Sequence, residues 1–264
     1  MKRLLTFAAV LFFGFGWTFA EQPTESQNHL ALNETSYGYE VTIDGKTFVG
    51  YHRDFNGTPI LWPVIGPNEK PMTRGFPMSN DIPGEKKDHP HHRSIWFTHD
   101  GVNGNRHWND GTIAHQEFLK AECDGKTATI VTKNHWLDKE SKDVICSDIR
   151  KVTLGTVDGG HRYIDFDVVL TAEQDAVTIA DTKEGTFGIR VPTTMDVDSK
   201  KGGTIVNAQG EKDDKAWGKR SDWVDYSGPV NPTDDAVAGI TVFNHPKSFR
   251  YPTWWHVRTY GLFA

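Results

Sequence analysis

The sequence concentrates its histidines, because five of the twelve lie between residues 89 and 107. The densest part reads Asp-His-Pro-His-His-Arg-Ser-Ile-Trp. If it is extended, alternate side chains share a side, so His89, His91 and Arg93 face one way and His92 the other. Neutral imidazoles move protons near pH 7, and a guanidinium holds an oxyanion or a carboxylate. The segment therefore predicts a proton-transfer or substrate-binding site.

Two other interpretations of this cluster stay open. A His-x-His pair on a strand can supply two metal ligands, with His115, Glu117 or Glu184 as the third. In that case the ligand set we expect is His89, His91 and His115. A polar surface loop without function is the remaining interpretation. Apart from this conditional metal ion, we expect no cofactor.

Two later segments also carry charged and aromatic groups. In Glu184-Gly-Thr-Phe-Gly-Ile-Arg190, the glycines permit close backbone approach, and Glu184 could act as an acid or base facing Arg190. A simple surface ion pair explains the same two residues. Further on, His256 and Arg258 share a face if the chain is extended. The neighbouring Trp255 could stack on a sugar ring, although large aromatic residues in β proteins more often pack in the core.

A Gly-rich stretch beside the histidine cluster suits polar ligands. Its Asn and Asp side chains can bond sugar hydroxyls, and an indole can stack on the C–H face of a sugar, although each residue alone is an ordinary turn residue. The residues concerned are Asp100, Asn103, Asn105, Trp108, Asn109 and Asp110.

Composition and missing motifs exclude several classes. The formal net charge of −6, with dispersed basic residues, gives no general attraction to nucleic acid. There is no phosphate loop, Cys-x-x-Cys pair, Gly-x-Ser-x-Gly elbow or His-Glu-x-x-His motif. A carbohydrate or another polar small molecule is the expected partner, and oligomeric state is not predicted.

The N-terminus has the pattern of a secretory signal peptide. Lys2 and Arg3 precede an uncharged, mostly apolar run, and Thr18-Phe19-Ala20 provides a cleavage site. We expect cleavage after Ala20 and a periplasmic or secreted product, although an uncleaved anchor is the alternative. Losing two positive charges changes the net charge from −6 to −8. Residues 21–35 are predicted to be a flexible tail, and residues 36–264 a single domain with no membrane contact.

The rest of the chain is predicted to be all-β. Residues 37–51 alternate around Asp44-Gly45, which is a strong hairpin signal. No segment sustains a helical apolar period over three turns, and about a dozen strands predict a large antiparallel β-sandwich. The expected strands are 37–43, 47–51, 59–65, 93–99, 118–123, 127–136, 144–154, 163–170, 177–180, 204–208, 240–243 and 256–263.

The predicted meander separates the two cysteines. Cys123 lies beside a turn at Asp124-Gly125, and Cys146 should pair near Lys133, so a third strand lies between them. At about 4.8 Å per strand, the cysteines lie roughly 10 Å apart. A disulfide requires Cα atoms within about 7 Å, so we predict two free thiols.

Three ordered motifs resemble one bacterial family. They are His89-Pro-His-His-Arg-Ser-Ile-Trp-Phe97, the segment 184–190, and His245-Pro246 followed by residues 251–264. Together they resemble the exported PmoA-like family, labelled "methane oxygenase PmoA" and frequent in planctomycetes and related polysaccharide-degrading bacteria. The resemblance spans most of the chain after residue 20, and Ser94 departs from the Gly that is more common in the family.

The resemblance implies a function in sugar catabolism more than methane oxidation. The methane monooxygenase subunit of that name is a polytopic membrane protein, and this sequence has no second apolar span. The resemblance implies a large β-sandwich, of which the galactose-mutarotase supersandwich is one form, with a His and a carboxylate acting on a sugar. Family chains normally continue beyond the Tyr-Gly-Leu-Phe-Ala stretch, so a truncated C-terminus is also expected.

The leading hypothesis is therefore an exported carbohydrate-active enzyme that uses His and Glu for acid–base chemistry in hydrolysis, elimination or epimerisation. The alternatives are a glycan-binding protein without catalysis and a His-ligated metal oxidoreductase. The predicted catalytic residues are His89, His91, His92 and Glu184, and the predicted substrate-binding residues are Arg93, Trp96, His115, Arg190, Trp255, His256 and Arg258.

Overall fold

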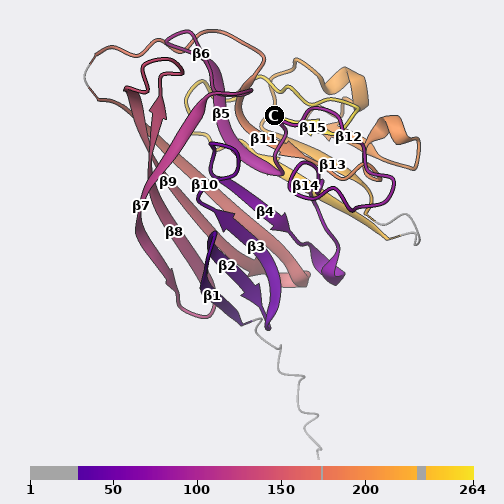
Figure 1. Ribbon diagram of the computed structural model, residues 1–264. Helices are drawn as coiled ribbons and strands as arrows, with labels where there is room; N and C mark the ends of the chain where they lie inside the picture. Colours follow the sequence, from indigo (N-terminus) through magenta and orange to yellow (C-terminus); the bar gives the residue numbers. More distant parts are fainter. Residues whose placement is uncertain (1–28, 174, 231–235) are drawn as a thin grey trace, which may run out of the picture.

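The computed structural model describes residues 29–173, 175–230 and 236–264, and within these ranges the chain is built from antiparallel strands (Figure 1). Helical structure in the described residues is confined to short 3₁₀ turns: η1 (Pro67–Glu69), η2 (Asp158–Gly160), η3 (Val197–Ser199) and η4 (Asp213–Ala216). No helix in these ranges is long and apolar enough to cross a membrane. The predicted all-β sandwich is confirmed. The predicted signal peptide lies outside the described residues.

The largest sheet carries most of the N-terminal half. Its strand order is β1 (Leu30–Thr35), β2 (Gly38–Ile43), β3 (Lys46–His52), β4 (Ile60–Val64), β5 (Ile95–Val102), β11 (Gly185–Arg190) and β15 (Leu262–Phe263), and β6 (Asn105–Arg106) pairs with β5. The predicted hairpin is β2–β3, and its turn places Asp44 and Gly45 at φ of 51° and 75°. These left-handed values suit Asp-Gly, which explains the strong sequence signal.

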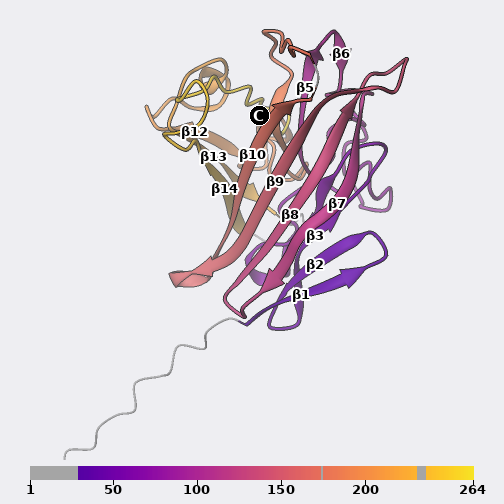
Figure 2. The ribbon, with the colours of Figure 1, turned by 90° about the vertical axis from the view of Figure 1, so that its left-hand side faces the viewer.

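A second sheet stacks against the first (Figures 1 and 2). Its order is β10 (His161–Ala172), β9 (Val144–Val157), β8 (Thr127–Leu137) and β7 (Thr112–Cys123). Burial alternates along β8, with Ala128, Ile130 and Trp136 fully buried between less buried neighbours. This period of two turns one face of the sheet toward the core. The packing buries apolar side chains between the two layers.

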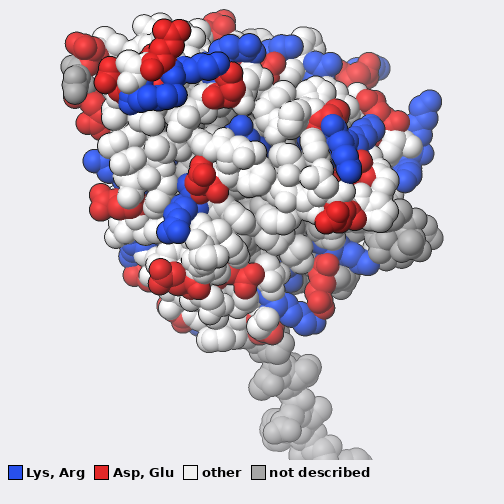
Figure 3. All heavy atoms as spheres, viewed as in Figure 1, with Lys and Arg blue, Asp and Glu red and all other residues white. Residues whose placement is uncertain are grey.

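The third sheet lies beside the other two (Figure 1) and shares their core. It contains β12 (Thr204–Asn207), β13 (Trp223–Pro229) and β14 (Val237–Phe243). Ile205, Val224 and Tyr226 of this sheet belong to one buried cluster with Val41 of the large sheet and Val152 of the second sheet. Acidic and basic side chains are interspersed over the face that Figure 3 shows.

Some local predictions were wrong. Residues 30–35 are not part of a flexible tail, because Leu30 is buried and its N–H bonds Gly125 O at 2.8 Å, which docks β1. Residues 21–28 lie outside the described ranges. Only Ile179 of the predicted strand 177–180 makes a bridge, and the predicted strand 256–263 reduces to β15.

The segment 185–190 is a strand that the sequence pattern did not predict. Gly185 and Gly188 weaken the strand signal, but β11 requires both of them. A Cβ at Gly185 would lie 2.1 Å from the His99 ring, and one at Gly188 would lie 2.5 Å from the Trp96 ring. The glycines therefore allow β5 and β11 to pair while large rings lie across them.

Both cysteines are free, as predicted. Cys123 pairs with Ala128 on β8, as expected, whereas Cys146 pairs with Trp136 instead of a residue near Lys133. The intervening strand β8 separates the two thiols, which is the reason the prediction gave.

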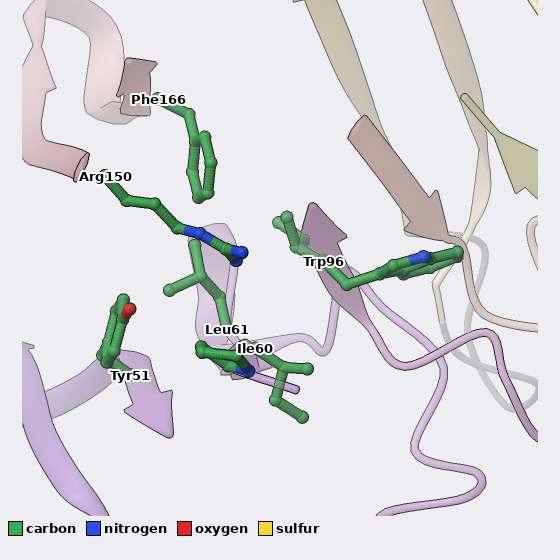
Figure 4. A pocket seen from close by; sticks show the side chains of 8 residues that line it. Tyr51, Ile60, Leu61, Trp96, Arg150 and Phe166 are labelled. Carbon is green, nitrogen blue, oxygen red and sulfur yellow. The ribbon is translucent and has the colours of Figure 1, made fainter. Parts of the chain in front are cut away.

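A buried polar network lies between the two large sheets. Asp148 on β9 accepts from Arg150 Nε and Nη2, both at 2.9 Å, from Trp136 Nε1 at 2.6 Å and from Asn134 Nδ2 at 2.7 Å. Figure 4 shows the adjoining space, where Arg150 and Tyr51 point inward and the Trp96 ring points away. That space has no room for a water molecule, so it is a packing defect and not a binding site.

Candidate functional site

A tight turn gathers the three histidines of the dense segment. His89 has a φ of 43°, and its carbonyl accepts from His92 N at 2.9 Å, so the segment is not extended. The His89 and His92 rings stack with centroids 4.8 Å apart, and His91 lies edge-on to both, at 5.7 Å from His89 and 4.5 Å from His92. The predicted separation of His92 from the other two is therefore wrong, because the turn breaks the strand period.

Arg190, at the end of β11, contacts this turn from its buried side. It is fully buried, and its Nη1 lies 2.8 Å from His92 Nδ1. Because arginine keeps its proton, His92 Nδ1 must accept this bond, which fixes His92 as neutral with its proton on Nε2. Burial and the Arg190 charge both lower the pKa of His92. His92 therefore has a structural role in the turn, and Arg190 fixes its position.

Asp88 connects Arg190 to the exposed side of the turn. Its carboxylate accepts from Arg190 Nη2 at 2.9 Å and 3.2 Å and also pairs with Arg74. The buried Arg74 additionally bonds the carbonyls of Asp88 and His89 at 2.9 Å and 3.2 Å. Although burial acts to raise the pKa of Asp88, the Arg190 charge and the neighbouring His89 and Arg74 hold it well below its usual range. The carboxylate therefore stays ionised.

Asp88 is also placed to orient His89. Its Oδ2 lies 2.9 Å from His89 Nδ1, which is buried and makes no formed hydrogen bond to a described residue. Catalytic contacts of this kind are often misaligned without substrate and tighten when it binds. A small rotation of the His89 ring would complete an Asp–His pair. The imidazole side chain is 39% exposed, so the pair can reach a ligand.

His91 is the least constrained imidazole of the cluster. It is half-buried, and its side chain makes no hydrogen bond to any residue within the described ranges. Burial, followed by the charges of His89 and Arg93, lowers the pKa of His91 to about 4. His91 is therefore a neutral base at pH 7, and neither ring nitrogen has a competing partner in the part of the chain that the structure describes.

Beside the histidine turn, a layer of buried side chains, which we call the floor, carries hydrogen-bond donors that have no acceptor among the described residues. Arg93 is 5% exposed and donates from Nη2 to Asn109 O at 3.2 Å, but its Nε and Nη1 have no partner in the described part of the chain. The same holds for the indole N–H groups of Trp96 and Trp108, whose rings lie 5.1 Å apart. Trp96 also stacks on His92 at 5.4 Å. A buried donor without an acceptor is costly, so these N–H groups are the unsatisfied polar groups nearest to the histidine turn.

Tyr260 joins the histidine turn to the C-terminal segment. Its ring stacks on His89 at 5.1 Å, and the guanidinium carbons of Arg190 and Arg258 lie 5.0 Å and 5.4 Å from its centroid. Burial raises the pKa of Tyr260, the two arginines oppose this rise, and Glu184 adds to it. The Glu184 carboxylate pairs with Lys183 at 3.7 Å. The predicted pairing of Glu184 with Arg190 is wrong, because Asp88 occupies that arginine.

Arg258 and His256 lie beside a surface hollow. The hollow measures about 260 Å³ and is lined by Asp214, Trp217, Val257, Arg258 and Thr259. Trp217 Nε1 donates to His256 Nδ1 at 2.9 Å, and Arg258 lies 5.7 Å from the centroid of a Trp217 ring. Burial, followed by the charges of Arg258 and Lys183, lowers the pKa of His256 to about 4. Contacts between Arg258 and Tyr260 and between Tyr260 and His89 connect this hollow to the histidine turn, and we call the residues along these contacts the strip.

The structure places two predicted residues away from this strip. His115 lies on β7 against Phe118, at 4.4 Å between ring centroids. Trp255 is buried in the core, where its Nε1 donates to Ser221 O at 2.8 Å and its ring packs on Phe263. Within the described ranges, no group of three or more His, Cys, Asp or Glu side chains is arranged to hold a metal ion. The expected ligand set with His115 is therefore not assembled.

Sequence reasoning missed several members of the site. Asp88 directly precedes the histidine cluster, so its carboxylate was a signal that could have been used. Tyr260 and Arg74 gave no local signal, because their role depends on contacts between distant segments. Trp217, and not Trp255, provides the exposed indole beside His256, and it is 47% exposed.

Comparison with known proteins gives one match. The model of a family of unknown function, DUF6807, matches residues 38–264. Neither the curated proteins nor the solved structures include a significant match to this chain.

Proposed function

The chain belongs to the DUF6807 family, whose function is unknown, and we propose from its own residues that it is an exported carbohydrate-active enzyme. In this proposal His91 and the Asp88–His89 pair move a proton at a sugar. The single observation that carries the proposal is the proximity of His91, a neutral imidazole without a hydrogen bond to the described residues, to a second imidazole, His89, whose Nδ1 lies 2.9 Å from the Asp88 carboxylate; the two ring centroids are 5.7 Å apart. Export follows from the signal-like pattern of residues 1–20.

The roles follow from protonation states. A base with a lowered pKa is ready to accept a proton at neutral pH, and His91 is such a base. His89 acts as the acid in its protonated form: the imidazolium, stabilised by the Asp88 carboxylate, donates its proton to the opposite atom of the substrate and becomes neutral, and proton exchange of His89 and His91 with solvent restores the starting state. Arg93 beside His91 would offer to an oxyanion the N–H groups of Nε and Nη1, which have no partner among the described residues. Glu184 would bind sugar hydroxyls or share in proton transfer.

The surroundings favour a carbohydrate over an apolar ligand. Buried N–H donors reject apolar groups and bind oxygen atoms, which sugars supply in number. The Tyr260 and Trp217 rings along the strip offer flat faces for the C–H side of a sugar ring. The resemblance of residues 89–97 and 251–264 to the PmoA-like family supports the same substrate class.

A glycan-binding protein without catalysis is the second candidate. It is favoured by Trp254, which is 69% exposed and lies 5.9 Å from the Arg220 guanidinium carbon, away from any acid–base pair. An exposed indole of this kind is a stacking platform. Turnover is the property that separates the two candidates.

We expect the wild-type protein to turn over one class of polysaccharide. Hydrolysis would release reducing ends, elimination would create a product that absorbs ultraviolet light, and epimerisation would exchange a sugar C–H in deuterated water. His89→Gln should reduce kcat by roughly 10²-fold or more, because removing a general acid or base typically costs this much. His161→Gln, an exposed histidine on β10, is the matched control. If the protein binds a glycan but none of the three readouts detects turnover, the second candidate, a glycan-binding protein without catalysis, is supported instead.

A further inference from the structure

Among the arginines of the site, only Arg258 is partly exposed and has a guanidinium without a hydrogen bond or ion pair to the described residues. Arg74 and Arg190 are fully buried and engaged with Asp88, and Arg93 is buried in the floor. The Arg258 side chain makes no hydrogen bond or ion pair with any residue of 29–173, 175–230 or 236–264. Its charge is therefore free to bind a ligand.

Aromatic rings fix the Arg258 guanidinium at the hollow. Its central carbon lies 5.7 Å from a Trp217 ring centroid and 5.4 Å from that of Tyr260. Contacts of this kind hold the guanidinium by its face and leave its in-plane N–H groups open. The backbone is also held, because Arg258 N donates to Leu262 O at 2.7 Å and Arg258 O accepts from Gly261 N at 3.0 Å. The cation is thus preorganised.

The charges around the hollow favour an anion at this point. Lys183 and Arg258 both act on His256, which lies next to Trp217 and stays neutral at pH 7. Lys183 pairs with Glu184 at 3.7 Å, so of these two cations Arg258 is the one that has no ion pair among the described residues. Asp214 is the acidic residue of the lining, and it is exposed and makes no ion pair with Arg258. Its carboxylate can accept from a sugar hydroxyl. A planar guanidinium with open N–H groups matches a carboxylate through two parallel hydrogen bonds.

We infer that the hollow beside Arg258 binds the acidic group of the carbohydrate, so that the substrates are anionic sugars, with the carboxylate of a uronic acid as the expected group. This inference rests on the proposed function and specifies its substrate class. Tyr260 contacts both Arg258 and His89, so a bound sugar chain would have its acidic residue at Arg258 and its reacting residue at the histidines.

Calorimetric titration of the full-length protein tests this inference with three probes: a galacturonic acid trimer, the neutral galactose trimer and a 6-sulfated galactose trimer. The wild type should bind the acidic trimer at least tenfold more tightly than the neutral one. Arg258→Met should weaken binding of the acidic trimer by roughly 10- to 100-fold, the usual effect of losing a hydrogen bond to a charged group, and leave the neutral trimer unchanged. Lys215→Met, which removes an equal charge from the exposed turn beside Trp217, should change neither.

Further probes and variants in the same titration identify the acidic group and separate loss of the anion site from misfolding. If the wild type prefers the sulfated trimer and Arg258→Met loses this preference, the anion site is supported and its acidic group is sulfate. Arg258→Lys retains a charge but not the planar fork, so it should keep only part of the preference. Equal binding of acidic and neutral trimers by the wild type, or equal losses for both in Arg258→Met, overturns the inference. If the neutral trimer is still turned over, the proposed function stands; if no trimer is bound or turned over, both fail.

Discussion

Replacing His91 by alanine should lower kcat on the sugar substrate by roughly 10²- to 10⁴-fold, the range for loss of a general base. The reason is that His91 is neutral at pH 7 and makes no hydrogen bond to a residue within the described ranges, so it is available as a base. His92 cannot replace it, because Nδ1 of His92 already accepts from Arg190. KM should change little, since the ring mainly serves the transition state.

Steady-state kinetics of three proteins checks this expectation: the wild type, His91→Ala and the exposed control His161→Ala. The control should retain wild-type kcat. Imidazole added to the buffer should restore part of the lost rate, because the cavity left by alanine is open to solvent. Retention of more than half of the wild-type kcat by His91→Ala would remove His91 from the mechanism. An equal rise in KM and fall in affinity, with kcat unchanged, would assign it to binding alone.

Replacing Asp148 by alanine should lower the free energy of unfolding by about 3–5 kcal/mol, because one partner of a buried ion pair is lost. Asp148 and Arg150 have side-chain exposures of 0% and 1%. The substitution would leave the Arg150 guanidinium, the Trp136 indole and the Asn134 amide without the acceptor they share. Each of these groups would have to be buried unpaired or draw water into the core.

Urea denaturation followed by circular dichroism gives the comparison. Asp167→Ala removes an exposed carboxylate from the neighbouring strand β10, and this control should change stability by no more than about 0.5 kcal/mol. A loss of less than about 1 kcal/mol in Asp148→Ala would show that the network relaxes more easily than its burial suggests. The histidine turn is separate from this network, so the loss should appear in stability and not in the affinity for sugar.

The period-two patterns predicted much of the fold. They located the β2–β3 hairpin and the meander β7–β8–β9, because half-buried strands alternate and Asp-Gly suits a tight turn. Strand β11 escaped detection because its glycines are required by rings on β5, and such a requirement is visible only after the strands are paired. The same applies to β1, whose docking depends on Gly125 in a distant turn.

The candidate site was predicted in part. The histidine cluster and Arg190 were recognised from residue types, and the structure brings them together. Their arrangement was not predictable, because it depends on the left-handed turn at His89 and on the pairing of Asp88 with Arg190, which is 102 positions away. Trp255 was named as a candidate and Trp217 was not, because sequence alone does not show which indole faces the core.

The most direct test of the central claim is the titration of the histidine side chains by NMR with ¹⁵N-labelled imidazoles, with the His91 signals assigned from His91→Gln. We predict that His91 stays neutral until the pH falls to about 4, because burial and the neighbouring cations disfavour its charged form. We also predict that an added uronic acid oligomer shifts the His89 and His91 signals while His115, on the remote strand β7, remains unchanged. Titration of His91 near the ordinary value of about 6.5, with no response to acidic or neutral sugars, would contradict it.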